Sequence, residues 1–417
     1  MQVKRSGRTP APWLFAIAAL PYGAFNGVIA LALPYLLRSD RVTLPQIASA
    51  LAVIQSPAIW YFLWAPIVDL RFRKRTWVLL LAVASAICAT AALHFGFATG
   101  LSAITALFVI GSILNQPISS ALGGLVSTVM PEKLQSRTAG WGQAGNLGGG
   151  ALAGGLALWV SVRWPGAAMA AVVGALVALP ALIVLAIDEP RRAPASVATR
   201  MAGVRTELAE MVRRREVWFA FLLFVSPAGS GALTALFPAA AVEYGASAGA
   251  VIWAVGVGGA ALMAGGALAG GFVCERYDRW LIYPAVGVMA ALSAGVMALM
   301  PLTPTTFILG SLSYALVTGF SYSAFMAIAL ELLGSESAGP GTQFTLCIAA
   351  TNAPMVYMLW IDGAAHARFG VHGMLIADAV ANGVAGILLV VAAWRYRARG
   401  RLGTSVAHVE HRTHPET

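Results

Sequence analysis

Residues Trp64 to Trp77 read Trp-Ala-Pro-Ile-Val-Asp-Leu-Arg-Phe-Arg-Lys-Arg-Thr-Trp, and this stretch decides the fold. An apolar run ends at Asp69, four basic residues follow within six positions, and a second apolar run begins at once. The pattern predicts two membrane helices joined by a short basic loop, which stays on the cytoplasmic side and orients both neighbours. Asp69, beside Arg71 and Arg75, can also cap the start of another helix and act as a gating latch. The alternative is that the loop only sets the topology.

The composition of the chain excludes an ordinary soluble domain. Of its 417 residues, 59% are hydrophobic and only 11% are charged, and the mean hydropathy is +0.77. These values predict an all-α polytopic protein that lies in the lipid bilayer. The net charge of +10 does not indicate a nucleic-acid partner, because the basic residues lie in short loops and at the chain ends rather than on one face. The three cysteines lie apart in apolar segments, without metal-ligand or redox spacing, so we expect no metal and no cofactor.

Apolar stretches long enough to cross a bilayer recur along the whole chain. The first is too long for a signal-peptide core and lacks a small-residue cleavage site, so we expect it to remain as a helix. The twelve predicted spans are 13–37, 44–69, 76–98, 101–130, 137–160, 164–187, 217–243, 247–274, 279–301, 304–334, 341–366 and 371–397. Because 23 of the 27 Lys and Arg residues fall on one side of these spans, both termini are predicted to be cytoplasmic.

The spans divide the chain into four parts. We expect an N-terminal six-helix bundle (1–187), a cytoplasmic linker with an amphipathic helix (188–216), a C-terminal six-helix bundle (217–397) and a disordered cytoplasmic tail (398–417). The two bundles are related by an internal repeat at a constant offset of 206 residues. The repeated pairs are Pro21 and Pro227, Asp69 and Glu275, and Asn146 and Asn352. A six-plus-six repeat in one orientation is typical of transporters that rock two bundles about a central site.

The second copy of the basic loop supports the latch interpretation. Glu275 is followed by basic residues, Arg276 and Arg279, on the same predicted side of the membrane as Asp69. Because the carboxylate and its basic neighbours are repeated, we predict a second gating pair there, made by Glu275 and Arg279.

These loops carry a family resemblance. They are similar to the major facilitator signature Gly-x-x-x-Asp-Arg-x-Gly-Arg-Arg, although Ala65 stands where the first glycine is usual. Within that superfamily, the segment 63–69 resembles the AmpG-like peptide and acetyl-coenzyme A transporters, as do Pro131-Glu132-Lys133 with Gly140-Trp141, and Thr342-Gln343-Phe344-Thr345. The resemblance implies that helices 1, 4, 7 and 10 line a central cavity. It also implies a cargo such as a muropeptide, acetyl-coenzyme A or a small siderophore, carried with protons.

Glycines four residues apart indicate helices whose backbones approach closely. They occur in helix 5 and helix 8, at Gly145 and Gly149, Gly150 and Gly154, and Gly266 and Gly270. The superfamily resemblance implies that helices 5 and 8 face each other across the interface between the halves. The alternative is packing within one half.

Polar residues within membrane spans are costly, so they suggest a substrate pathway. They form stripes in the four helices that the resemblance assigns to the cavity, and we predict that they bind substrate, together with the repeated asparagines. The residues are Tyr22, Asn26, Asn115, Gln116, Ser119, Ser226, Ser230, Tyr314, Thr318, Tyr322, Asn146 and Asn352. A hydrogen bond to a neighbouring helix is the alternative for each of them. No Lys or Arg lies in the middle of a span, which disfavours a multiply anionic cargo such as acetyl-coenzyme A.

Proton coupling requires a titratable group within the membrane. Asp362 and Asp378 lie eight residues before and after Gly370, so antiparallel helices place both about 12 Å from the same turn. Two carboxylates that meet in a low dielectric form a proton site. The alternative is neutralisation by Arg368, His366 or His372. Glu331 and Glu243 are the lesser candidates.

The sequence therefore predicts a monomeric secondary transporter in a bacterial inner membrane, which imports a small organic solute, a muropeptide or small siderophore, with protons. A second hypothesis reverses the direction and makes the protein a drug or metabolite exporter. An intramembrane enzyme or sensor is a hypothesis of another class. The chain lacks His-Glu-x-x-His, Gly-x-Ser-x-Gly and a clustered nucleophile and base, so we expect no enzymatic activity.

Overall fold

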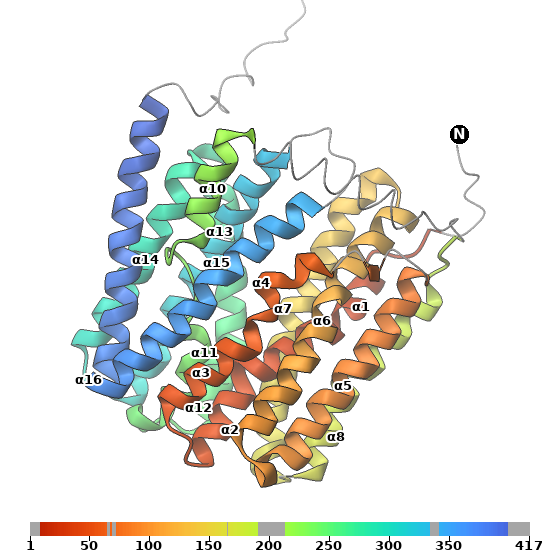
Figure 1. The fold of residues 1–417 in the computed structure, drawn as a ribbon, viewed down its shortest axis with the longest axis horizontal. Helices are drawn as coiled ribbons and strands as arrows, with labels where there is room; N and C mark the ends of the chain where they lie inside the picture. The colour runs from red at the N-terminus through yellow and green to blue at the C-terminus, as the bar shows by residue number, and fades with distance from the viewer. Residues whose placement is uncertain are drawn as a thin grey trace, which may run out of the picture.

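The structure is a computed structural model that describes residues 9–64, 67–68, 72–164, 166–190, 213–333 and 342–398. Two helical halves lie side by side, with the N-terminal half drawn in red to yellow and the C-terminal half in green to blue (Figure 1). The predicted amphipathic helix of the linker, the C-terminal tail, and the gating residues Asp69 and Arg71 lie outside the described residues.

The N-terminal half contains six membrane crossings. The first consists of α1 (Leu14–Gly27), η1 (Val28–Ala32) and α2 (Leu33–Ser39). The second consists of α3 (Leu44–Gln55), α4 (Pro57–Trp60) and η2 (Tyr61–Leu63). The others are α5 (Lys74–Thr99), α6 (Leu101–Val129), α7 (Glu132–Arg163), and α8 (Ala167–Ala178) with η4 (Leu179–Ala186).

The C-terminal half contains the other six. They are α10 (Arg215–Val225) with α11 (Leu233–Ala240) and η5 (Ala241–Tyr244); α12 (Ala248–Val251) with η6 (Ile252–Val257) and α13 (Gly258–Arg276); α14 (Arg279–Leu299); α15 (Pro304–Leu333); and both arms of α16 (Thr342–Ala398). Gly370, at φ 64°, separates the two arms of α16. The predicted twelve crossings are thus confirmed in the described chain.

Two predicted spans differ from the observed helices. The span 44–69 ends as a helix at Leu63. The span 217–243 is broken between Val225 and Leu233, because Pro227 has no backbone N–H to donate and two glycines adopt positive φ, 75° at Gly229 and 68° at Gly231. Only glycine enters that region at low cost, so the break is encoded locally.

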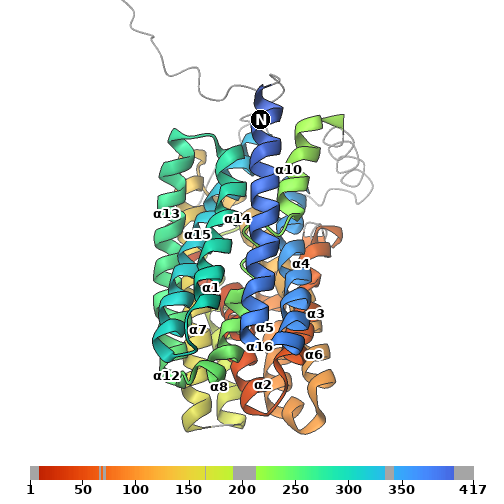
Figure 2. The ribbon, with the colours of Figure 1, turned by 90° about the vertical axis from the view of Figure 1, so that its left-hand side faces the viewer.

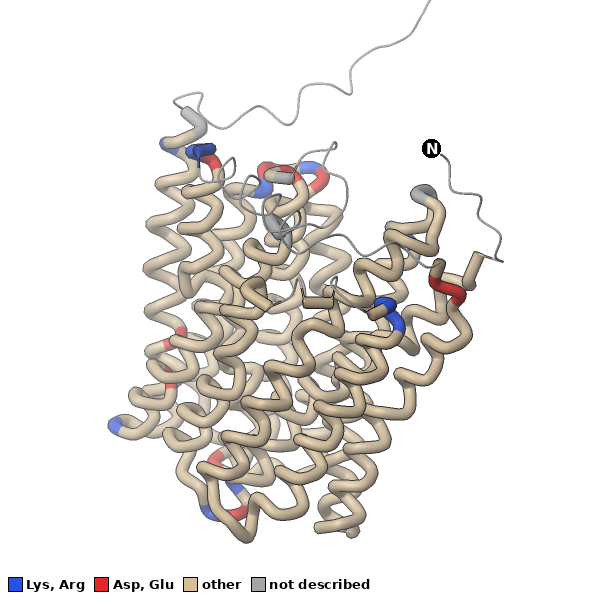
Figure 3. Tube along the Cα trace, turned by 45° about the vertical axis from the view of Figure 1, so that its right-hand side comes forward, with Lys and Arg blue, Asp and Glu red and all other residues tan. Residues whose placement is uncertain are grey.

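Charged residues lie mainly at the two ends of the bundle, and acidic positions interrupt the middle of the C-terminal half (Figure 3). We call the end where α5 begins at Lys74 and α10 begins at Arg215 the basic end. The opposite end, which carries Arg38 and Glu243, is called the far end.

The two halves share a large apolar core at the far end, whereas toward the basic end a small cluster around Tyr61 and Ala349 joins them. At the far end, Leu37 of α2 and Phe237 of α11 belong to one buried apolar cluster that crosses the interface, and α3 packs along α16. At the basic end each half has its own cluster, around Val78 in one and Trp280 in the other. Burial of a common core therefore closes the far end.

The glycine stripes pack within the halves, which is the stated alternative for them, whereas helices 5 and 8 do face each other across the interface, where α7 contacts α12, η6 and α13. Gly145 lies against the backbone of Ala16, and Gly154 lies against that of Gly27, so α7 packs on α1. In the other half, Gly266 lies against the backbone of Leu316, so α13 packs on α15. Four-residue spacing reports close approach but does not identify the partner helix.

Candidate functional site

The break between α10 and α11 is held by side chains from two other helices of the C-terminal half. The backbone N–H of Gly229 donates to Oδ1 of Asn382 at 2.9 Å, and the hydroxyl of Ser321 donates to the carbonyl oxygen of Gly229 at 3.2 Å. These bonds satisfy backbone groups that the interrupted helix leaves free. Figure 2 shows α16, which carries Asn382, between α14 and α10.

Asp378 lies one helical turn before Asn382 and is fully buried. The hydroxyl of Tyr314 donates to both carboxyl oxygens of Asp378 at 3.1 Å, and Nδ2 of Asn382 donates to its backbone carbonyl at 3.0 Å. Ser230, in the helix break, lies within hydrogen-bonding reach of the Tyr314 hydroxyl. Asp378 is therefore linked to the break both through Asn382 and through Tyr314.

Asp362 is the second fully buried carboxyl group, and it lies within electrostatic range of Asp378. The convergence that the turn at Gly370 predicts is thus present. Neither side-chain oxygen of Asp362 has a hydrogen-bond partner within the described chain. Burial of two carboxylates without a basic partner is prohibitive, so the pair must hold a proton or a cation.

The alternative, neutralisation by a nearby basic residue, does not occur among the described residues. Nε2 of His366 contacts Oε1 of Glu243 at 2.9 Å, and Nδ1 of His372 contacts the carbonyl oxygen of Ala298 at 2.8 Å. Arg368 is exposed and forms no ion pair with a described residue. The acid pair is therefore uncompensated within this part of the chain.

A charged bridge joins the two halves at the far end. Nη2 of Arg38, at the end of α2, lies 3.1 Å from Oε1 of Glu243 in η5, and the same oxygen contacts His366 of α16. We call these three residues the far-end bridge. It joins the two halves, and His366 lies one turn of α16 from Asp362.

The N-terminal half contributes a separate polar cluster. The hydroxyl of Tyr22 donates to Oε1 of Gln116 at 3.2 Å, while Nδ2 of Asn26 and Nδ2 of Asn115 donate to the carbonyl oxygen of Tyr22. Oδ1 of Asn115 is buried without a hydrogen-bond partner. The predicted stripes of helices 1 and 4 thus face each other.

Tyrosines from both halves meet near this cluster. Tyr22 lies within electrostatic range of Tyr61 and of Tyr322, and the side chain of Tyr322 is 57% exposed. The hydroxyl of Tyr61 lies within hydrogen-bonding reach of Thr345 in α16. Tyr61 and Thr345 were missed because the resemblance directed attention to helices 1, 4, 7 and 10; a tyrosine within an apolar span was the available signal.

Several predicted substrate ligands use their polar groups within the protein. Ser119, Ser226 and Thr318 donate to backbone carbonyls of their own helices, at Gln116, Leu223 and Tyr314 respectively. Nδ2 of Asn146 donates to Gln143 in the same helix. Nδ2 of Asn352 donates to the carbonyl oxygen of Ala58 at 3.2 Å, so it ties helix 11 to helix 2 across the interface.

The residues of the basic end form local pairs. Glu189 accepts from the backbone N–H groups of Lys74 and Arg75 at 2.9 and 3.0 Å, which caps the start of α5. This cap follows helix 6, and sequence reasoning missed it. An acidic residue just after a span, close to basic residues at the start of another, was the available signal.

The predicted gating pair of the second half is arranged differently from the prediction. Nε of Arg279 lies 3.1 Å from Oε2 of Glu331, and Nε1 of Trp280 donates to Oε1 of the same carboxylate. Glu275 is exposed and forms no ion pair with a described residue. Two residues predicted for different roles, Arg279 for gating and Glu331 for protons, therefore form one ion pair.

Comparison with known proteins places these features in context. Residues 15–350 match the sequence model of the Major Facilitator Superfamily. A bacterial homologue of the human lysosomal transporter Spinster, in an inward-facing and unoccupied conformation, is 18% identical with a TM-score of 0.71, and the match covers 96% of this chain and 100% of that one. A D-xylose–proton symporter is 13% identical with a TM-score of 0.73, covering 92% and 97%.

A POT family transporter in complex with 5-aminolevulinic acid is 12% identical with a TM-score of 0.71, covering 92% of this chain and 96% of that one. No curated protein matches the chain significantly. At these sequence identities the structural likeness shows the fold alone, and the chemistry of the site depends on its own residues.

Proposed function

Because the chain belongs to the Major Facilitator Superfamily, and is thus a multi-pass secondary transporter of small molecules, we propose that it couples movement of a small organic solute to movement of protons. Asp362 and Asp378 are the proposed proton site. The observation that carries the proposal is the complete burial of both carboxyl groups, one on each arm of α16, without an ion pair to a described basic residue. Such a pair stays in the membrane only if it binds a proton or a cation, and in the proposed mechanism the release of a bound proton changes the charge of the site.

The hydrogen bonds around Asp378 supply a route from proton binding to conformational change. Asp378 contacts Tyr314 and Asn382, and Asn382 in turn holds the N–H of Gly229 in the break between α10 and α11. A change of charge at Asp378 therefore acts on the start of α11. The α11 helix continues into η5, which carries Glu243 of the far-end bridge.

This arrangement supports alternating access. Charging or neutralising the acid pair shifts the α11–η5 segment about the glycine break, and this shift weakens or restores the bridge between Glu243 and Arg38. The far end then opens or closes while the basic end moves in the opposite sense. The break acts as the hinge in this mechanism, because Gly229 and Gly231 tolerate large φ/ψ changes.

The residues near the interface suit a polar solute of low net charge. Tyr22, Gln116 and Asn26 of one half and Tyr322 of the other offer hydroxyl and amide groups and aromatic surface. In the described spans no Lys or Arg lies midway between the ends, so a multiply anionic solute would lack a countercharge. Within the proposed AmpG-like family, this favours a muropeptide or a small siderophore over acetyl-coenzyme A.

Two structural neighbours are described as handling small polar solutes, D-xylose in one and 5-aminolevulinic acid in the other. Both solutes agree with the proposed class of cargo. The excess of basic residues at the basic end supports a cytoplasmic location for that end, in an inner membrane. We propose that the protein acts as a monomer and in the direction of uptake.

The proposal is tested with purified protein in liposomes that contain a pH-sensitive dye. Anhydro-muropeptide and a neutral aromatic siderophore are added in turn to the wild type, to Asp378→Asn and Asp362→Asn, and to Asp40→Asn, which changes an exposed far-end carboxylate. We expect one solute to acidify the lumen of wild-type and Asp40→Asn liposomes, and no acidification in the other two variants. Exchange of labelled solute without a gradient should persist in Asp378→Asn and shows that it is folded.

Three results would contradict parts of the proposal. Accumulation of labelled solute without any pH change would exclude proton coupling. Full acidification in Asp378→Asn liposomes would show that coupling does not depend on the acid pair. Proton-driven uptake found only in inside-out vesicles would establish the exporter hypothesis instead.

A further inference from the structure

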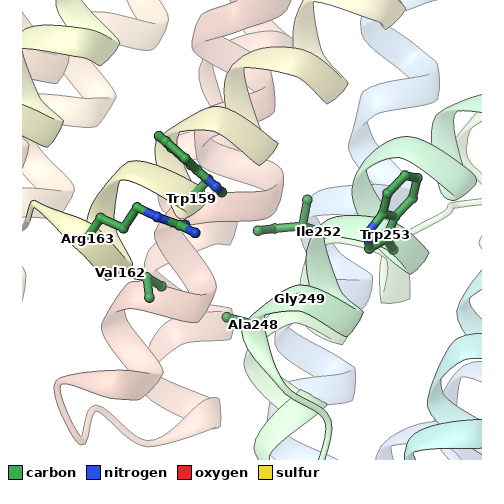
Figure 4. A pocket seen from close by; sticks show the side chains of 7 residues that line it. All are labelled: Trp159, Val162, Arg163, Ala248, Gly249, Ile252 and Trp253. Atoms are coloured by element: carbon green, nitrogen blue, oxygen red, sulfur yellow. The ribbon is translucent and has the colours of Figure 1, made fainter.

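A cavity of about 270 Å³ lies at the far end, between the last turn of α7 and the first turns of α12 and η6. It is lined by residues of both halves, and Figure 4 shows the Arg163 side chain extending from α7 toward the gap that Ile252 borders on the other side. The lining residues are Trp159, Val162, Arg163, Ala248, Gly249, Ile252 and Trp253. No residue of the acid pair or of the far-end bridge lines the cavity, and the cavity has no part in the proposed proton step.

The walls of the cavity are apolar and face outward from the bundle. Trp253 is 69% exposed and Trp159 is 39% exposed, and both lie close to one end of a membrane crossing, at Arg163 and at Ala248. Tryptophans at this depth are typical of the boundary between hydrocarbon and head groups. In a bilayer, an exposed apolar wall at this depth faces lipid chains.

Arg163 supplies the one charge among the lining residues. Its guanidinium lies over the ring of Trp159, 4.2 Å from the centroid, and it forms no ion pair with a described residue. Stacking fixes the plane of the guanidinium but leaves its N–H donors unused. The planar donor fork fits two oxygens of a phosphate, so the chemistry of the site is that of a phosphate bound above an apolar groove.

We propose that this cavity binds one anionic phospholipid, with its phosphate on Arg163 and its acyl chains along Val162, Ile252 and Trp253. An anionic head group is favoured over a zwitterionic one because none of the lining residues is acidic, so a choline or ethanolamine group would have no countercharge. A lipid of net negative charge also gains from the positive charge of Arg163 without bringing a second cation to the site.

The lipid is expected to act on the conformation of the protein. Trp159 and Arg163 belong to the N-terminal half and Ile252 and Trp253 to the C-terminal half, so the complete cavity exists only when the far ends are together. Close approach of the halves at this point is evident where Gly155 lies near Ile252. A ligand that binds one conformation in preference to another shifts the population toward it, and an anionic lipid therefore stabilises the closed far end.

The test uses the full chain, purified in detergent, and needs no transport assay. Native mass spectrometry compares retention of phosphatidylglycerol and of phosphatidylcholine with the same acyl chains, for the wild type, Arg163→Gln and Arg368→Gln. Arg368 is the matched control because it is an exposed arginine at the same end and outside the cavity. We expect the wild type to retain one phosphatidylglycerol in preference to phosphatidylcholine, and Arg163→Gln to lose affinity about fivefold, as for one charged hydrogen-bonding group that is partly exposed.

Retention by Arg368→Gln should match that of the wild type. Equal retention by Arg163→Gln and the wild type would overturn the proposal, as would equal retention of the two lipids by the wild type. A second measurement distinguishes loss of lipid binding from misfolding of the variant. Phosphatidylglycerol should raise the melting temperature of the wild type more than that of Arg163→Gln. An identical rise in both proteins would also overturn the proposal.

Discussion

The two halves share one repeat, yet around the acid pair the C-terminal half is polar where the N-terminal half is apolar. In the N-terminal half the rings of Phe25 and Phe108 lie 5.9 Å apart in the buried core. Their sequence mates at the offset of 206 residues are Gly231, in the helix break, and Tyr314, which donates to Asp378. The mates of Asp362, Asp378 and Asn382 are Leu156, Val172 and Leu176.

This difference distinguishes the residues that the fold requires from those that serve a function. A six-helix bundle of this kind folds in the N-terminal half with phenylalanine and aliphatic residues at these positions, so the fold does not require the acids, the tyrosine or the broken helix. Buried polar groups of this kind are costly. Their presence in one copy alone indicates a task that the other copy does not perform.

The largest effect is expected from a substitution that removes one oxygen atom and gives the C-terminal half the residue found at the equivalent position of the N-terminal half. Tyr314→Phe installs the residue found at Phe108 and removes the hydroxyl that donates to both oxygens of Asp378. Loss of a hydrogen bond to a charged group is worth about 1.5–3 kcal/mol, so proton-coupled uptake should fall roughly tenfold to a hundredfold. Dye-reported proton flux in liposomes measures this effect.

The matched control for Tyr314→Phe is Tyr244→Phe, because the Tyr244 hydroxyl is buried near the far end with no hydrogen-bond partner in the described chain. Removing that hydroxyl should leave uptake unchanged. Equal losses in the two variants would mean that Tyr314 acts through packing alone.

A smaller effect concerns how each half packs its first helix. The Cβ of an alanine at Gly145 would overlap the carbonyl oxygen of Ala16, whereas at Gly148, one turn along the same helix, nothing lies within 4 Å. The mate of Gly145 is Thr351, whose hydroxyl bonds to Ile348 of its own helix. Backbone contact between helices is thus a property of the N-terminal copy at this position.

Two alanine variants should therefore move stability in opposite directions. Gly145→Ala should destabilise the protein by about 1–3 kcal/mol because the helices must separate. Gly148→Ala should be neutral or stabilise it by up to about 1 kcal/mol, because alanine favours the helix. Melting temperatures in detergent report both, and a matching decrease in the two variants would contradict the close packing of α7 on α1.

The sequence was sufficient for much of the fold. The length of the apolar stretches predicted the crossings. The positions of Asp362 and Asp378, each eight residues from Gly370, predicted that they lie near each other, because residues equally far from a turn lie at the same level in two antiparallel helices. Asn382 was missed although it lies four residues after Asp378 and therefore on the same helix face. Pro227 followed by two glycines, Gly229 and Gly231, was the available signal for the helix break.

Other features depend on contacts that no local pattern encodes. Arg38, Glu243 and His366 come from three distant segments, and each is an ordinary polar residue near a span end. The glycine stripes predicted close packing correctly but not the partner, since four-residue spacing is the same for any helix that approaches. Likewise Glu331 is conspicuous in sequence, and only the structure pairs it with Arg279.

The smallest expected effect tests whether the far-end bridge joins the halves. The mates of Glu243 and His366 are Leu37 and Val160, so the bridge has no equivalent within the N-terminal half and depends on Arg38 alone from that side. Arg38 and Glu243 are 23% and 24% exposed, and ion pairs of this kind contribute about 0.2–1 kcal/mol. A double-mutant cycle of Arg38→Gln and Glu243→Gln, measured by melting temperature, should show coupling of that size, whereas the effects of Arg368→Gln and Glu243→Gln should be additive.

Because the bridge spans the interface, either single variant should also broaden the distribution of distances between spin labels placed on α2 and α11. Coupling without any broadening would mean that the shared apolar core around Leu37 and Phe237 closes the far end without help from the charges.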